Sequence, residues 1–156
     1  MASAVTREAL GAWLLKCNPA LWDLRGFRAA GETRVTSWAV QPNYRSLMMR
    51  PGDRALFWVS GPGRGDLVRG LWGSGSVVGG AEEWVDGERG FWRSEPGREA
   101  VRGRVRLDVE LWTAPVTDAE LRARGVGDLE VQVMPYGSNP SWVTRGQLAV
   151  IDELSD

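Results

Sequence analysis

The clearest pattern in the chain is an alternation of apolar and charged positions over residues 102–112. Val105, Leu107, Val109 and Leu111 alternate with charged side chains. Since successive side chains of a strand point to opposite faces, this period of two predicts a half-buried β-strand. Apolar or β-branched stretches predict further strands over residues 12–16, 33–40, 54–60, 67–78 and 129–134.

Short helices are expected between these strands. Asn18 precedes Pro19, which suits the first turn of a helix, and an apolar stripe follows as far as residue 31. Thr117 and Glu120 have the spacing of a capping box. The predicted helices span residues 19–31, 44–49, 117–125 and 144–153.

The order of these elements indicates the fold class. Strands and helices do not alternate regularly, which disfavours a doubly wound parallel sheet. Glycines along residues 70–80 indicate bends and bulges of the kind that small barrels need. Residues 81–100 are polar and read as a long surface loop. We therefore predict a single α+β domain over residues 1–156: a small, mostly antiparallel β-barrel of about six strands flanked by short helices.

Composition removes most enzyme classes. The 156 residues include no histidine and one cysteine, Cys17, so neither a histidine-based triad nor an internal disulfide can form, and the common zinc sites lack ligands. No phosphate-loop or dinucleotide-binding motif is present. The apolar run at residues 12–15 is far shorter than a membrane span. We predict a cytoplasmic protein that is not an enzyme, without metal, cofactor or membrane contact.

Two biases favour nucleic acid as a partner. The chain has nine tryptophans against two tyrosines and three phenylalanines, and Lys16 is the only lysine among 19 cations. Tryptophan and arginine stack on nucleobases, and arginine also binds phosphate through two hydrogen bonds. Residues 1–75 carry ten cations and five anions, whereas residues 76–156 carry nine and fifteen. A surface that faces phosphates should therefore come from the first half.

A pocket for a planar base needs aromatic walls, polar groups for the base edge and cations for the flanking phosphates. Residues 13–60 supply all three kinds. The aromatic candidates are Trp13, Trp38, Tyr44 and Trp58; the polar candidates are Asn18, Ser37, Asn43 and Ser60; the phosphate-binding candidates are Arg45, Arg50 and Arg54.

Ordinary structural roles compete with these assignments. Tryptophan is highly buried on average, and core packing is the expected role of Trp13, Trp22, Trp72, Trp112 and Trp142. The alternative role of Asn18 is that of a helix cap, and the alternative position of Arg45 is on a solvated helix face. Trp38 stands just before a predicted loop, so we expect its indole to open onto solvent.

The predicted loop at residues 81–100 also carries aromatic side chains. Trp84, Phe91 and Trp92 lie within it, where they could close over a pocket as a lid or contact a partner.

Several short motifs occur in a familiar order. They are Trp13 to Pro19, Ser37 to Val40, Asn43 to Arg45, Pro51 to Asp53, Phe57 to Gly61, and the glycine-rich stretch from Gly70. Together they resemble the EVE domain, a family related to the PUA and YTH domains, and the likeness extends over most of the chain. The resemblance implies a PUA-like β-barrel with a pocket for a single, often modified, nucleobase flipped out of DNA or RNA, and no catalysis.

The resemblance also assigns pocket residues. It places Lys16, Cys17 and Asn18 at the pocket, with Ser37 and Trp38 as the leading wall, Asn43 and Tyr44 beside them, and Trp58 to Ser60 opposite. A serine commonly precedes the asparagine in the related methyl-reading domains, so Cys17 departs from the pattern. The family's frequent association with restriction systems implies a nuclease as a further partner.

Two other functions stay open at this point. PUA-type RNA binding would show no preference for modified bases. A small-molecule or protein-interaction domain would bind no nucleic acid, and the acidic second half of the chain favours it.

Overall fold

The computed structural model describes residues 4–61, 67–85 and 101–155, with the backbone alone for residues 81–85 and 101–102. Six strands and several short helices form an α+β fold. In chain order the elements are β1 (Leu10–Cys17), α1 (Leu24–Ala29), β2 (Arg34–Val40), α2 (Tyr44–Met48), β3 (Arg54–Val59), β4 (Gly70–Val85), β5 (Val101–Thr117), α4 (Asp118–Ala123), α5 (Glu130–Val133), β6 (Ser141–Thr144) and α6 (Arg145–Ser155).

All six strands belong to one mixed sheet with the order β2-β5-β4-β3-β1-β6. β1 and β3 are parallel, whereas the other pairings among the described strands are antiparallel. The α+β class and the number of strands are confirmed, although only five of the six strands lie where the sequence predicted them. The ladder does not close into a barrel, because β2 and β6 remain its two edges.

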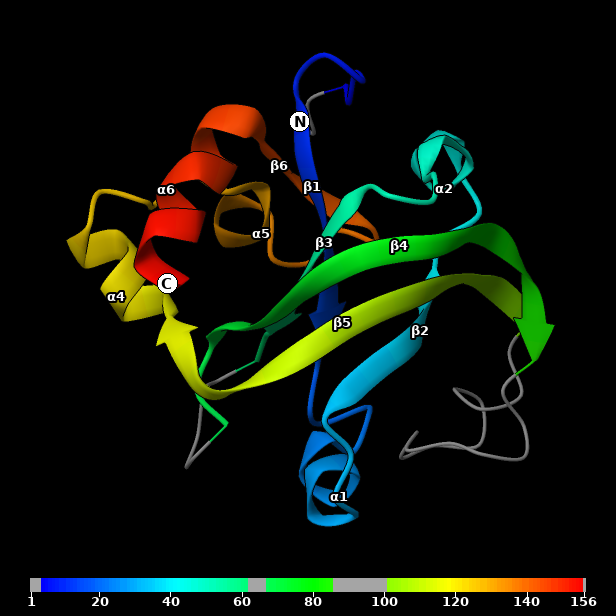
Figure 1. The fold of residues 1–156 in the computed structure, drawn as a ribbon, viewed down its shortest axis with the longest axis horizontal. Coiled ribbons are helices and arrows are strands. Elements are labelled where there is room, and N and C mark those ends of the chain that lie inside the picture. The colour runs from blue at the N-terminus through cyan, green and yellow to red at the C-terminus, as the bar shows by residue number, and fades with distance from the viewer. Residues whose placement is uncertain (1–3, 62–66, 86–100, 156) are drawn as a thin grey trace.

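The parallel pair is buried on both faces. Leu15 and Phe57 belong to one apolar cluster, whereas Leu14 and Leu56 belong to another on the opposite face. Helices α4, α5 and α6 pack against the second cluster and lie together on one side of the sheet (Figure 1). Strands covered on both faces carry apolar residues at nearly every position, which explains the continuous apolar runs of β1 and β3.

The long antiparallel pair β4 and β5 curves across the molecule (Figure 1). Its backbone pairing continues to Val85 and Val101, so residues 81–85 extend a strand that the sequence interpretation had assigned to a loop. Register shifts occur beside Gly73 and Gly79, as expected where a strand bends sharply. Among the described helices, none is long and apolar enough to cross a bilayer.

Two segments correct the sequence prediction. The expected strand at residues 129–134 is instead the helical turn α5, in which the Gln132 side chain accepts a hydrogen bond from the Leu129 backbone nitrogen at 2.9 Å. Six residues are too few to separate a strand period from a buried helical turn. The expected turn at residues 139–142 is correct only for its first half, because Ser141 and Trp142 already belong to the short edge strand β6.

The first predicted helix is also shorter than expected. Asn18 caps a single turn, in which its Oδ1 accepts from the Ala20 nitrogen at 3.0 Å. The helix proper, α1, begins after Asp23, whose carboxylate accepts from the Gly26 nitrogen at 2.9 Å.

The close approach of β4 to β5 requires a glycine at position 75. A Cβ atom there would lie 1.8 Å from the carbonyl oxygen of Asp108 on β5. We expect Gly75→Ala to lower the free energy of unfolding by about 3 kcal/mol, the upper part of the range for overpacking. Urea unfolding measures the change. Gly146→Ala is the control, since a Cβ in α6 meets nothing within 4 Å; equal stability of the two variants would contradict this packing.

Candidate functional site

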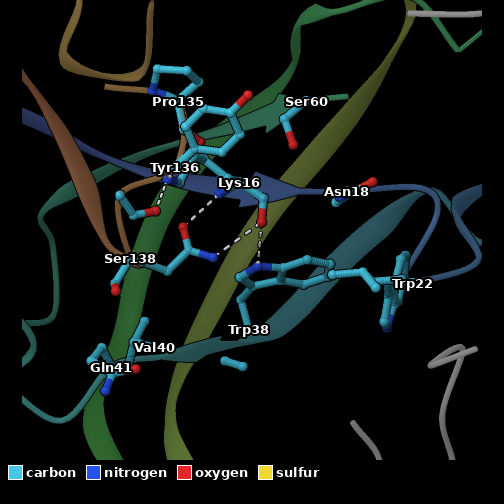
Figure 2. A pocket seen from close by; sticks show the side chains of 14 residues that line it. Lys16, Asn18, Trp22, Trp38, Val40, Gln41, Ser60, Pro135, Tyr136 and Ser138 are labelled. Carbon is cyan, nitrogen blue, oxygen red and sulfur yellow. Dashed lines mark hydrogen bonds between the residues drawn. The ribbon is translucent and has the colours of Figure 1, made fainter. Parts of the chain in front are cut away.

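A cavity of about 590 Å³ opens where β1 ends, between β2 and the loop that precedes β6 (Figure 2). This volume falls within the range of roughly 300–1,000 Å³ that is typical of small-molecule and cofactor sites. We call it the β1-end cavity. Its lining residues are Lys16, Asn18, Leu21, Trp22, Trp38, Ala39, Val40, Gln41, Ser60 and Pro135 to Asn139.

The carbonyl oxygen of Lys16 joins three parts of the cavity wall: the end of β1, strand β2 and the loop before β6. It accepts hydrogen bonds from Trp38 Nε1 at 3.0 Å and from Asn139 Nδ2 at 3.1 Å, both visible in Figure 2. Asn139 Oδ1 in turn accepts from the Lys16 backbone nitrogen at 2.8 Å. Since Leu14 pairs with Ser141, the register places Asn139 opposite Lys16. Asn139 precedes the first residue of β6, so its side chain continues the pairing of β1 where β6 has not yet begun.

A second hydrogen bond attaches the same loop to β2. The Gln41 backbone nitrogen donates to the Asn139 carbonyl oxygen at 2.7 Å. Gln41 directly follows β2, and Asn139 lies two residues before β6. The two edges of the open sheet thus approach one another beside the cavity, although no strand ladder joins them.

Trp38 forms part of the floor of the cavity. Its indole is 4% exposed, so the expectation of a ring open to solvent is wrong. Trp22 and Phe57 contact it in edge-to-face geometry, with ring centroids 4.8 and 5.1 Å away. These neighbours and the hydrogen bond to Lys16 hold the indole in place, so it offers a ligand only the small part of its surface that remains exposed.

Polar side chains enter the cavity where the two parallel strands stop. Asn18 follows β1 and Ser60 follows β3. The Ser60 hydroxyl donates to the Cys17 carbonyl at 3.3 Å, which leaves its lone pairs for a ligand. Asn18 keeps its Oδ1 in the turn, and no described residue accepts from its Nδ2. One donor and one acceptor are thus available at the same end of the sheet.

Lys16 supports the loop that forms the outer wall. Its ammonium donates to the carbonyl oxygens of Gly137 and Pro135. Burial lowers the pKa of Lys16, and it outweighs the attraction of the Glu130 carboxylate, which acts in the opposite direction. The only lysine of the chain therefore positions the loop rather than projecting freely towards a ligand.

A buried ion pair holds the two ends of this loop. Arg45 on α2 donates to both carboxylate oxygens of Glu130 on α5, at 2.6 and 2.8 Å, and to the Pro140 carbonyl at 3.2 Å. Ser141 donates to Glu130 at 2.8 Å. Burial alone would raise the pKa of Glu130, but the hydrogen bonds from Arg45 and Ser141 outweigh it and keep that pKa below its ordinary value.

Four of the nine predicted base-binding residues meet at the β1-end cavity: Lys16, Asn18, Trp38 and Ser60. Trp58 does not, because it points to the opposite face of the sheet and belongs to the apolar cluster that includes residues of α4, α5 and α6. Cys17 is fully buried in the core, where burial raises the pKa of its thiol. Ser37 also points away from Trp38 and accepts a hydrogen bond from Arg104 at 2.9 Å.

The remaining two predicted base-binding residues lie at a smaller cavity of about 260 Å³ on the other side of the loop. Asn43 is the N-cap of α2, and its Oδ1 accepts from the Arg45 nitrogen at 3.0 Å. Tyr44 is half exposed, and its hydroxyl oxygen accepts from the Val5 nitrogen at 3.1 Å. Both belong to the packing of α2 rather than to the wall beside Trp38.

The predicted phosphate-binding arginines are dispersed. Arg45 is buried against Glu130 and is not a surface cation. Arg54 pairs with Asp152 at a different depression of the surface. Arg50 is exposed, and its role in binding phosphate stays a prediction.

The predicted lid lies largely outside the described residues. This applies to Phe91, Trp92 and the side chain of Trp84. The backbone of Trp84 pairs with Arg102 at the end of the long hairpin.

The sequence interpretation missed the loop at residues 135–139 and two aromatic residues beside the cavity, Trp22 and Tyr136. An available signal was the aromatic Tyr136 between a proline and a glycine, since an aromatic residue in such a turn has no regular element to bury it. Within the described part of the chain, no three histidine, cysteine, aspartate or glutamate side chains gather as metal ligands.

Comparisons with known proteins address the fold alone. No family model and no curated protein matches this chain. A hypothetical protein from Leishmania major is similar in structure, with 21% identity, a TM-score of 0.60 and 96% of both chains covered. A protein from Pseudomonas syringae shares 20% identity with a TM-score of 0.51, over 92% of this chain and 98% of the other. The chain therefore shares its fold with both proteins over nearly its whole length.

The ion pair behind the loop should contribute measurably to stability. Glu130→Gln leaves the Arg45 charge buried without its partner, and we expect a loss of about 3 kcal/mol in the free energy of unfolding. The exposed pair of Arg54 and Asp152 provides the control, since Asp152→Asn should cost at most about 1 kcal/mol. Equal losses in urea unfolding of the two variants would contradict this role.

The same pair predicts a pH dependence. Because the folded-state pKa of Glu130 lies below its unfolded value of about 4.3, its contribution is fully present above that pH and disappears as the pH falls through the folded-state pKa. Between pH 6 and pH 3, Glu130→Gln should therefore lose less stability than the original protein. If the free energy of unfolding fell equally with pH in both proteins, folding would not lower the pKa of Glu130.

Proposed function

We propose that the chain is an EVE-like domain that binds nucleic acid without catalysis and receives one flipped base, typically a modified one, in the β1-end cavity. The observation that carries this proposal is the cavity itself. The side chain of Trp38, the ends of two parallel strands and a firmly held loop enclose a space of about 590 Å³. Asn18 and Ser60 supply hydrogen-bonding groups within it.

A PUA-like barrel is the finer fold that we propose for this arrangement. The approach of the sheet edges at Gln41 and Asn139 supports it, since one backbone hydrogen bond spans the remaining gap. The indole of Trp38 lies across the same gap and bonds to Lys16. These two hydrogen bonds across the open side of the sheet support the proposal of a barrel.

The cavity suits a planar, polar ligand better than an aliphatic one. A base offers ring nitrogens, carbonyl oxygens and amino groups along one edge, and Asn18 and Ser60 present a donor and an acceptor towards such an edge. A base that leaves these groups unpaired would forfeit about 1–3 kcal/mol for each buried group. Hydrogen bonding therefore provides stronger discrimination between bases than contact area does.

Selectivity for a modified base requires shape as well. Burial of one methyl group contributes only ~0.8 kcal/mol, or about fourfold in affinity. Unstacking a base from a duplex costs a few kcal/mol, and each aromatic contact returns roughly 1–3 kcal/mol. Since little of the Trp38 side chain is exposed, enclosure by the whole cavity must offset most of this cost.

Substitution of Asn18 tests the proposal. Asn18→Asp keeps an oxygen for the turn with Ala20, but replaces the free amide donor with a second negative oxygen. We expect it to weaken binding of an oligonucleotide that carries one modified base at least 10-fold, because a carboxylate repels both base acceptors and phosphates. Quenching of tryptophan fluorescence measures the affinity. Gln147→Glu on α6 makes the same charge change outside the cavity and is the control.

Three results would overturn the proposal or change it. If Asn18→Asp and Gln147→Glu weakened oligonucleotide binding equally, the binding surface would lie outside the β1-end cavity. Equal affinity for modified and unmodified RNA would favour PUA-type binding without modification selectivity. Absence of binding to DNA and RNA at low salt would reject a nucleic-acid function.

A further inference from the structure

Tyr136 is the most exposed aromatic side chain among the described residues. Its side chain is 99% exposed, whereas Trp22 and Trp38, which line the same cavity, are buried. A large aromatic ring that makes almost no contact with its own chain gains nothing from folding. Single exposed apolar side chains are common on protein surfaces, so it is the place of Tyr136 at the edge of a cavity that makes it a candidate for contact with a ligand.

The loop that carries Tyr136 is held firmly. The Gly137 nitrogen donates to the Met134 carbonyl at 3.1 Å, which closes a turn around the tyrosine. Lys16 binds the carbonyl oxygens of Pro135 and Gly137, on either side of it. Asn139 then joins the loop to β1 through two further hydrogen bonds. The backbone beneath Tyr136 is thus fixed, and its ring is presented at a defined place.

The position of Tyr136 relates it to the cavity. The ring lines the β1-end cavity beside Lys16, between Pro135 and Ser60 in the view of Figure 2. Leu21, which is about half exposed, lines the same cavity. A base that occupies the space beside Trp38 leaves its sugar and phosphates towards the exterior, and the neighbouring nucleotides of the strand then lie at the level of the tyrosine.

We propose that Tyr136 stacks on a base that flanks the flipped nucleotide. This inference rests on the proposed function and deepens it, since it makes the ligand a polynucleotide rather than a free base or nucleoside. Every base has a π-face, so a stacking residue outside the cavity contributes affinity without sequence preference. In a single strand the ring extends the stack, and in a duplex it fills the gap that the flipped base leaves.

Flanking abasic sites provide the sharpest test. One oligonucleotide carries a modified base between two ordinary nucleotides, and a second has abasic sites at both flanking positions. Tyr136→Ala should weaken binding of the first about 5- to 150-fold and leave binding of the second within about twofold, since the stacking partner is absent there. Each pair is measured as a single strand and as a duplex, which distinguishes extension of a stack from filling of a gap.

Two matched variants control this experiment. Tyr136→Phe keeps the ring and should retain the affinity of the original protein for both oligonucleotides. Leu47→Ala removes an apolar side chain that is 85% exposed on α2 and does not line the cavity. It should leave both affinities unchanged. Because both residues are exposed, all three variants should unfold at the temperature of the original protein.

The outcomes separate this inference from the proposed function. Equal weakening of both oligonucleotides by Tyr136→Ala would show that the ring acts on the flipped base or its phosphates, and would overturn the inference. No weakening at all, or equal weakening by Tyr136→Phe, would also overturn it. If Asn18→Asp still weakens binding at least 10-fold in these cases, the proposed function stands without a stacking role for Tyr136.

Discussion

The carbonyl oxygen of Lys16 accepts one hydrogen bond from the Trp38 indole and another from the Asn139 side chain. The three residues come from β1, from β2 and from the loop before β6, which are far apart in the sequence. Each bond contributes only about 1 kcal/mol to stability, but leaving this carbonyl buried without a partner would cost more. The pairing therefore fixes how the end of β1 sits against the opposite edge of the sheet. The cavity exists because these parts meet there without a continuous strand ladder to fill the space.

The parallel pair of β1 and β3 determines which side chains reach that space. β1 and β3 are buried on both faces and end at Cys17 and Val59, which are paired in register. The first polar residues after them, Asn18 and Ser60, therefore emerge side by side. Carboxyl ends of parallel strands meet at one edge of a sheet, so two hydrogen-bonding groups converge without a dedicated loop. The same double burial places Trp58 in the second apolar cluster, on the face of the sheet against which α4, α5 and α6 pack.

Local patterns predicted the α+β class, most strands and the short helix α2, because alternation and capping act over a few residues. The sequence also identified Asn18, Trp38 and Ser60 as candidates for one pocket, and the structure brings them together. It could not reveal that Arg45 binds Glu130, since that contact joins residues 85 positions apart. Nor could it show which face of β3 meets the cavity, because apolar residues occupy both faces. Tyr136 was missed because its segment resembles a strand followed by a turn.

The most direct test of the central claim follows the indole N–H signals of the nine tryptophans by nuclear magnetic resonance. An oligonucleotide with one modified base is added stepwise. If the base enters the cavity beside the Lys16 carbonyl, the signals of Trp38 and Trp22 should shift first and most. The signal of Trp13, whose Nε1 donates to Asp53 away from the cavity, should stay in place. A large shift of Trp13 together with an unchanged Trp38 signal would contradict the assignment of this cavity.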